Sequence, residues 1–340
     1  MTERDATHQS NKRDALFDCL RGDREGEALG LIASMGVTTL SSLRFPYAEK
    51  DIFTVLMVAV MRGQMRVVKV LLKRGVDMNA GRLSWHETYR YTLINTPLLY
   101  AISSENNFLL DLLLENGADP LYDIKTFLNV SNIPFLSALG KGGYIFHRII
   151  KYSNVFTEFG CYRHRYTCNK HTCLCYAISY HLDKYVSPES FQFIQKIIQK
   201  GGIVCSGHSG NSIFGTGTRT CSQIYQCLAK KVKYLNDGTV VNECLSLVCS
   251  TDYVHENSTL YCTLKTFTDT IMENDGPAAS DELRKASITW LANVTKQPST
   301  LKHICRVHIR RFIPGLCIEA VKTLPLPTEL IDYINVVNKK

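Results

Sequence analysis

Apolar residues recur at helical spacing along most of the chain, and one pattern of them occurs twice. The first copy begins with the run Thr54 to Ala59 and ends at Gly75, and the second begins with Thr96 to Ala101 and ends at Gly117. In both copies the alanine follows the threonine by five residues and the glycine follows it by 21. The shared offsets indicate an internal structural repeat.

The order of residues within each copy predicts a pair of helices. The threonine is placed to cap a short first helix, the alanine permits close packing, and paired leucines or valines mark the buried face of a second helix. A glycine then stands where a helix end requires a left-handed residue. These two copies resemble the ankyrin repeat.

Weaker copies of the same pattern lie on both sides. Residues 133–138 and 173–177 repeat the opening run, and the latter copy reaches Gly201 after an insertion at 180–188. Residues 16–36 are interpreted as a degenerate first repeat, since terminal repeats are often atypical. Residues 206–297 contain four segments of helical spacing without a repeat register: 221–234, 240–249, 260–272 and 281–294.

The segment 298–312, called the basic helix below, has the most informative pattern. Its apolar positions fall on one helical stripe, and its basic residues, Arg306 among them, occupy the other faces. From these residues alone, the simplest reading is an amphipathic helix that packs on the preceding repeat. Downstream, Leu324-Pro325-Leu326-Pro327 leads into a second apolar helix, because two prolines favour an extended approach and then a helix start.

In this order and spacing, the two elements together resemble a SOCS box. The resemblance implies that the first element binds Elongin C and the second selects a cullin. The Elongin-binding residues would be Thr300, Leu301, Ile304, Cys305 and Ile309, and the cullin-binding residues would be Leu324, Pro325, Leu326, Pro327, Leu330 and Tyr333.

Ankyrin repeats followed by a SOCS box resemble the ankyrin-repeat and SOCS-box protein family. That resemblance implies an all-α fold, with a solenoid of stacked helical hairpins and a C-terminal three-helix SOCS box. It also implies a non-catalytic substrate receptor of a ubiquitin ligase, whose partners are Elongin C, Elongin B, a cullin with its RING protein, and a substrate protein. The alternative is an ankyrin scaffold or inhibitor whose C-terminal helices only cap the solenoid.

An insertion between the two strong repeats is the candidate substrate-binding site. Their threonines are 42 residues apart, whereas the ankyrin period is about 33. The excess falls at 82–93 and contains aromatic and basic residues of the kind found at interface hot spots. These candidates are Trp85, His86, Tyr89, Arg90 and Tyr91. Trp85 could instead pack against the neighbouring repeat.

The 13 cysteines raise the question of a metal site. The N-terminal residues are charged where a secretory signal would be apolar, so we expect reduced thiols and a cytoplasmic protein, with the nucleus left open. Cys161, His164, Cys168 and His171 offer four zinc ligands, but in no standard finger spacing. We therefore expect no metal and no other cofactor, and keep zinc at these residues as the alternative. No nucleophile motif accompanies any Cys–His pair.

The excess basic residues behind the net charge of +8 are not gathered in one segment of the sequence. Residues 160–205 and 298–340 each contribute +4, and the remainder is balanced. We therefore expect protein partners, not nucleic acid or a membrane. The predicted organisation is a flexible N-terminus at 1–13, about five ankyrin repeats at 14–205 with insertions at 82–93 and 180–188, further degenerate helical hairpins at 206–297, and a SOCS box at 298–340.

Overall fold

The computed structural model describes most of the repeat region and parts of the C-terminal region. The described residues are 3–48, 51–86, 90–122, 133–141, 143–154, 159–160, 170–183, 188–202, 262, 265, 269, 289, 301, 304–306, 309 and 321–334. The chain divides into two compact units, residues 1–153 and residues 154–340.

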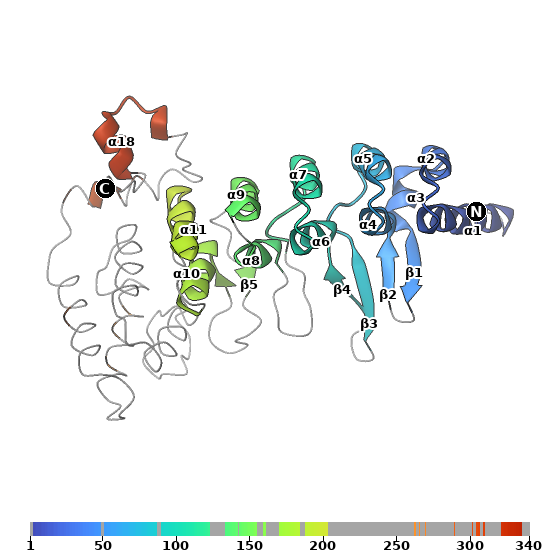
Figure 1. Cartoon of the computed structure of the whole chain (residues 1–340), viewed down its shortest axis with the longest axis horizontal. Helices are drawn as coiled ribbons and strands as arrows, with labels where there is room; N and C mark the ends of the chain where they lie inside the picture. The colour runs from blue at the N-terminus through green and yellow to red at the C-terminus, as the bar shows by residue number, and fades with distance from the viewer. Residues whose placement is uncertain are drawn as a thin grey trace. The chain divides into compact units, whose positions relative to one another are not determined.

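The first unit is a stack of helix pairs, as the repeat pattern predicts. Its pairs are α1 (Glu3–Arg21) with α2 (Glu25–Ala33), α4 (Val55–Met61) with α5 (Met65–Lys73), α6 (Pro97–Ser103) with α7 (Asn107–Glu115), and α8 (Pro134–Ala138) with α9 (Gly143–Tyr152). A short α3 (Val37–Ser42) follows the first pair. In Figure 1 the second helices α2, α5, α7 and α9 lie in one row, and α4, α6 and α8 lie in another. The helical solenoid is thereby confirmed.

The residues that define the repeat perform the structural roles expected of them. The Thr54 hydroxyl accepts a hydrogen bond from the backbone N–H of Met57 at 3.3 Å, and Thr96 accepts one from Leu99 at 3.1 Å. Each threonine therefore satisfies a donor that the helix start leaves open. Gly75 has a φ of +77°, which confirms the left-handed helix end.

Apolar pairs on the second helices form the core of the stack. The members with almost no exposed surface are Val67, Val68, Leu71, Leu109, Leu110 and Leu113. Because α5 and α7 present these residues at i, i+1 and i+4, each helix buries one face between neighbouring pairs.

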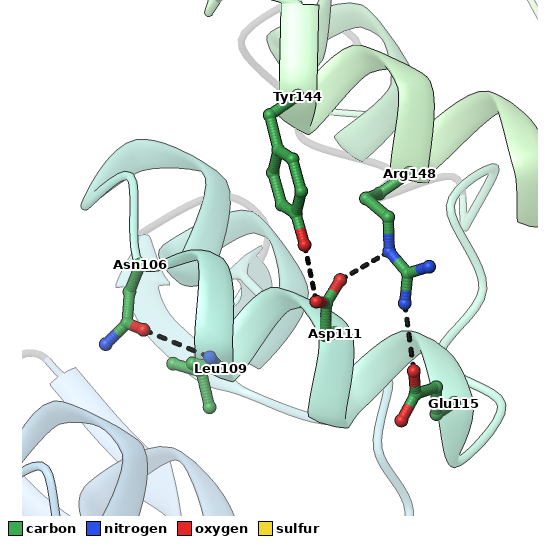
Figure 2. A network of polar contacts seen from close by, with 6 residues as sticks. All are labelled: Asn106, Leu109, Asp111, Glu115, Tyr144 and Arg148. Carbon is green, nitrogen blue, oxygen red and sulfur yellow. Dashed lines mark hydrogen bonds and ion pairs between the residues drawn. The ribbon is translucent and has the colours of Figure 1, made fainter.

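A polar network joins α7 to α9 (Figure 2). The Asp111 carboxylate accepts a hydrogen bond from the Tyr144 hydroxyl at 2.6 Å and another from Nε of Arg148. The same guanidinium donates to Glu115 at 2.9 Å. The side chain of Arg148 is only 16% exposed, so the network closes a partly desolvated contact between successive repeats.

Strands extend from the repeats and pair into one antiparallel sheet, which the sequence did not predict. β1 (Arg44–Ala48), β2 (Asp51–Thr54), β3 (Arg82–His86) and β4 (Arg90–Asn95) occur in that order across the sheet. The insertion at 82–93 forms most of the β3–β4 hairpin. Its aromatic and β-branched residues favour an extended conformation, and the sheet lies beside the helices of the first unit (Figure 1).

The N-terminal segment that the sequence analysis expects to be flexible, residues 1–13, overlaps the first helix. α1 begins at Glu3 and therefore covers almost all of residues 1–13. Residues 3–21 contain neither glycine nor proline. Helix can therefore extend without interruption from the turn that buries Leu16 and Leu20.

The second unit contains a further helix pair, α10 (Cys173–Asp183) and α11 (Pro188–Gln199). These helices have 11 and 12 residues, against 7 in α6 and 9 in α7. The insertion at 180–188 therefore lengthens the helices as well as their connection. Thr172 precedes α10 and accepts a hydrogen bond from the backbone N–H of Cys175 at 3.4 Å, the same cap as in the two strong repeats.

The cysteines of the described residues are free thiols, as expected. Cys173 and Cys175 are fully buried in α10, where they act as small apolar groups. Burial is also the main cause that raises the pKa of the Cys173 thiol far above its ordinary value. Thiols of this kind are chemically inert.

Two of the four helical segments expected within 206–297 lie outside the described residues, namely 221–234 and 240–249. Cys262, Lys265 and Asp269 are helical and fall in the segment predicted at 260–272. Thr289, in the segment predicted at 281–294, is helical as well. None of the helices described has the length and apolar character needed to cross a membrane.

Candidate docking surfaces

The C-terminal elements share a small apolar core of their own. Val321 and Ile334, at 0% and 3% exposure, form its centre. Ile309 of the basic helix packs on them, together with three residues from the downstream element: Leu324, Leu326 and Ile331. The residues of the two sequence motifs are thus brought into one folded module, although the motifs are separated in the chain.

The basic helix divides its apolar residues between this core and solvent. Leu301 is 76% exposed and Cys305, one turn later, is also exposed. Ile304 is half-buried, and Ile309 packs into the core. All these positions are helical, whereas Thr300 lies outside the described residues. The helix therefore presents an exposed leucine and thiol next to a face that is already packed.

Arg306 is buried, although it lies off the apolar stripe of the basic helix. It is 8% exposed, and its guanidinium carbon lies 4.2 Å from the centroid of the Tyr333 ring. One guanidinium nitrogen also donates a hydrogen bond to the Tyr333 carbonyl at 3.4 Å. Burial lowers the pKa of Arg306 from its ordinary value, yet the group stays charged because arginine titrates so far above neutral pH.

The residues expected to bind a cullin fall into two groups. Leu324 and Leu326 are half-buried and pack on Val321 and Ile334. The two prolines that alternate with them, Pro325 and Pro327, are exposed. The Leu-Pro-Leu-Pro motif is thus a strap whose leucines fix it to the core and whose prolines face outward.

Helix α18 (Thr328–Ile334) continues directly from this strap (Figure 1). The Pro327 carbonyl accepts hydrogen bonds from the backbone N–H groups of Leu330 and Ile331 at 3.0 and 3.1 Å. Leu330 is 39% exposed and is available to a partner. Tyr333, one turn later, is half-buried beneath Arg306.

The β3–β4 hairpin holds the candidate substrate-binding residues. Its register pairs Trp85 with Tyr91 and His86 with Arg90. Successive strand positions face opposite sides of a sheet, so the two pairs occupy positions on opposite faces. Trp85 is 38% exposed, whereas Tyr89 lies outside the described residues. Among the described candidates, the register therefore places Trp85 and Tyr91 at positions on one face of the hairpin and His86 and Arg90 at positions on the other.

The base of this hairpin is fixed to the neighbouring strand. The Arg82 guanidinium forms an ion pair with Asp51 at 2.6 Å and lies 5.8 Å from the centroid of the Phe53 ring. Leu83 and Ile52 are paired in register between β3 and β2 and are half-buried. The hairpin is thus anchored where it leaves the repeats, and Trp85 is placed two residues beyond Leu83.

Only one of the four residues that could hold zinc is among those described. His171 lies in β6 (Lys170–His171), which pairs with β5 (Phe159–Gly160). Cys161, His164 and Cys168 lie outside the described residues. Within the described part of the chain, no cluster of three or more His, Cys, Asp or Glu side chains could hold a metal ion.

Two known protein families match segments of the chain. A family model of ankyrin repeats, containing three copies, matches residues 29–123, and the SOCS box model matches residues 297–335. No curated protein matches the chain. The second match covers the module built around Val321 and Ile334. The chain therefore carries ankyrin repeats followed by a C-terminal SOCS box, which is the domain combination of the ankyrin-repeat and SOCS-box protein family.

Proposed function

We propose that this chain is the substrate-recognition subunit of an Elongin B/C–cullin–SOCS-box ubiquitin ligase. The observation that carries the proposal is the exposure of Leu301 and Cys305 on a helix whose neighbouring face is packed into the SOCS box core. A helix that only capped a solenoid would cover such a leucine. An exposed apolar anchor pair at i and i+4 instead fits recognition by a partner's groove.

The two ends of the SOCS box would contact different partners. Leu301 and Cys305 enter Elongin C, with Ile304 beside them and Thr300 at the helix start. Pro325, Pro327 and Leu330, which are exposed on the strap and α18, face the cullin. Leu324 and Leu326 support that surface from within.

The receptor itself catalyses no bond chemistry in this proposal. It holds a substrate protein close to a ubiquitin-charged conjugating enzyme on the same scaffold, which raises the effective concentration of the substrate lysine. We expect the assembly to act in the cytoplasm, and fractionation of cells that express the full chain would show any nuclear pool.

We assign substrate binding to the β3–β4 hairpin, because insertions in repeat proteins often build the binding face. The exposed Trp85, with Tyr91 opposite it in register, supplies the aromatic pair that interface hot spots favour. His86 and Arg90 occupy the other face, and Tyr89 lies between the strands in the chain.

Co-purification of Elongin B and Elongin C with the full chain tests the ligase assignment. The double variant Leu301→Ser, Cys305→Phe should lose both proteins while its repeats stay folded, because both residues are exposed in the free chain. Leu330→Ser is the matched control, since it removes an exposed leucine from α18 and should keep Elongin. Elongin binding by the double variant at the wild-type level would refute the assignment. A wild-type chain that binds no Elongin would favour the scaffold alternative.

The substrate surface is tested by partner capture with two variants of the full chain. Deletion of residues 83–91 should remove the substrate, and Trp85→Thr with Tyr91→Thr should do so while preserving residues that favour strand structure. Ser84→Val with Thr92→Val, the adjacent cross-strand pair, is the control. If both variants retain every partner, Trp85 serves to pack the hairpin and the substrate binds elsewhere.

A further inference from the structure

Arg306 and Tyr333 form a directional contact between the two halves of the SOCS box. Arg306 belongs to the basic helix and Tyr333 to the last turn of α18, 27 residues later. The guanidinium lies over the tyrosine ring with 4.2 Å between its carbon and the ring centroid, and it donates a hydrogen bond to the same residue's carbonyl. One side chain thus engages both the ring and the backbone of α18.

A second contact between the two halves, within the described residues, is apolar. Ile309 packs on Val321 and Ile334, and apolar packing is not directional. Such a contact holds α18 close but tolerates some rotation of the helix. A planar guanidinium that stacks on a ring and donates to a carbonyl restricts that rotation, because both interactions depend on geometry.

The orientation of α18 decides where its exposed apolar residue, Leu330, points. Leu330 lies three residues before Tyr333, on a neighbouring part of the helix surface, and is 39% exposed. A rotation of α18 that released Tyr333 from Arg306 would turn Leu330 toward a different direction relative to Leu301 on the basic helix.

We propose that Arg306 and Tyr333 are positioning residues that set the orientation of α18, so that Tyr333 promotes cullin binding through Arg306 and not by touching the cullin. This inference rests on the proposed ligase function and refines it. Tyr333 then lies beneath the cullin-binding surface and supports it, and is not itself one of the residues that contact the cullin.

A double-mutant cycle on the full chain in complex with Elongin B and Elongin C tests the inference. Binding of purified cullin is measured for wild type, Arg306→Leu, Tyr333→Leu and the double variant. Each single variant should weaken cullin binding by about tenfold, which corresponds to about 1.4 kcal/mol and lies within the range of desolvated cation–π contacts. The double variant should be no weaker than Arg306→Leu alone, because Arg306→Leu already removes both the ring contact and the hydrogen bond to the Tyr333 carbonyl, whereas Tyr333→Leu removes only the ring contact. Tyr333→Phe keeps the ring and should bind within about twofold of wild type.

Three controls separate positioning from loss of fold and from failure of the ligase assignment. Elongin affinity should stay unchanged in every variant, since Leu301 and Cys305 are untouched, and a parallel loss of Elongin and cullin binding would overturn positioning in favour of general unfolding. Leu330→Ala should add little to the effect of Arg306→Leu, because Arg306 acts in this proposal by orienting the helix that carries Leu330. Wild-type cullin affinity in Arg306→Leu, or additive effects of Arg306→Leu and Tyr333→Leu, would also overturn it. A wild-type chain that binds neither Elongin nor cullin would instead refute the proposed function.

Discussion

Truncation of Leu301 should weaken Elongin binding without destabilising the chain. Leu301→Ala removes three carbon atoms, and each buried carbon contributes about 0.8 kcal/mol, or about 2.4 kcal/mol for complete transfer from water. Leu301 is 76% exposed in the free chain, so about three quarters of this, about 1.8 kcal/mol, is gained only when the partner covers it. The expected loss of affinity is therefore about 20-fold.

The measurement is titration calorimetry of purified Elongin B–Elongin C into the full chain, with thermal unfolding of the same samples. The unfolding midpoint should hardly move, because an exposed leucine contributes little to the fold and alanine favours a helix at least as well. Leu330→Ala, an equal truncation on α18, should leave Elongin affinity unchanged. An affinity of Leu301→Ala within twofold of wild type would show that the exposed leucine is not the anchor, and a lowered midpoint would show that it supports the fold.

Three further predictions concern the repeats. Asp111→Ala should lower the free energy of unfolding by about 1–2 kcal/mol in urea denaturation, because both Tyr144 and Arg148 lose an acceptor. The Tyr144 pKa is raised, chiefly by its hydrogen bond to Asp111, so this contact stabilises the fold below about pH 10 and is lost as pH rises further. Tyr144→Phe should therefore be less stable than the wild-type chain at neutral pH, and it should lose less stability than the wild type above about pH 10. If the stability of both proteins changed with pH in the same way, this prediction would be wrong. Thr96→Ala should cost about 1 kcal/mol by leaving the Leu99 N–H uncapped, and unchanged denaturation would refute the cap.

The repeat architecture could be predicted from the sequence because its signals are local. Thr96 caps α6 by accepting from the backbone N–H of Leu99, three residues later, and Gly75 ends α5 in a left-handed conformation. Both roles depend on short-range backbone geometry. Thr172 performs the same role in α10, and a search for threonine ahead of each opening run would have found it. The extent of α1 toward Glu3 was not predicted, because residues 3–13 contain a single apolar residue, Ala6, and so leave no apolar pattern to detect.

The sheet was not predicted for a different reason. The aromatic residues of the insertion indicated a hairpin tip, but β1 and β2 become part of one sheet with β3 only when successive repeats stack. Pairing between Ile52 and Leu83 joins residues more than 30 positions apart, and no local pattern specifies such a pairing. The separation of Trp85 and Tyr91 from His86 and Arg90 follows from strand alternation once these residues are known to lie in paired strands.

By itself the sequence determined the helix pairs, because caps, helix ends and apolar spacing act over a few residues. Its resemblance to a SOCS box marked Leu301 and Cys305 as anchor candidates. Only the tertiary structure decided which motif residues face outward. It buries Arg306 under Tyr333 and turns Leu324 and Leu326 inward. The physical reason is that burial depends on what the other half of the module supplies: a ring for the guanidinium and a valine–isoleucine core for the leucines.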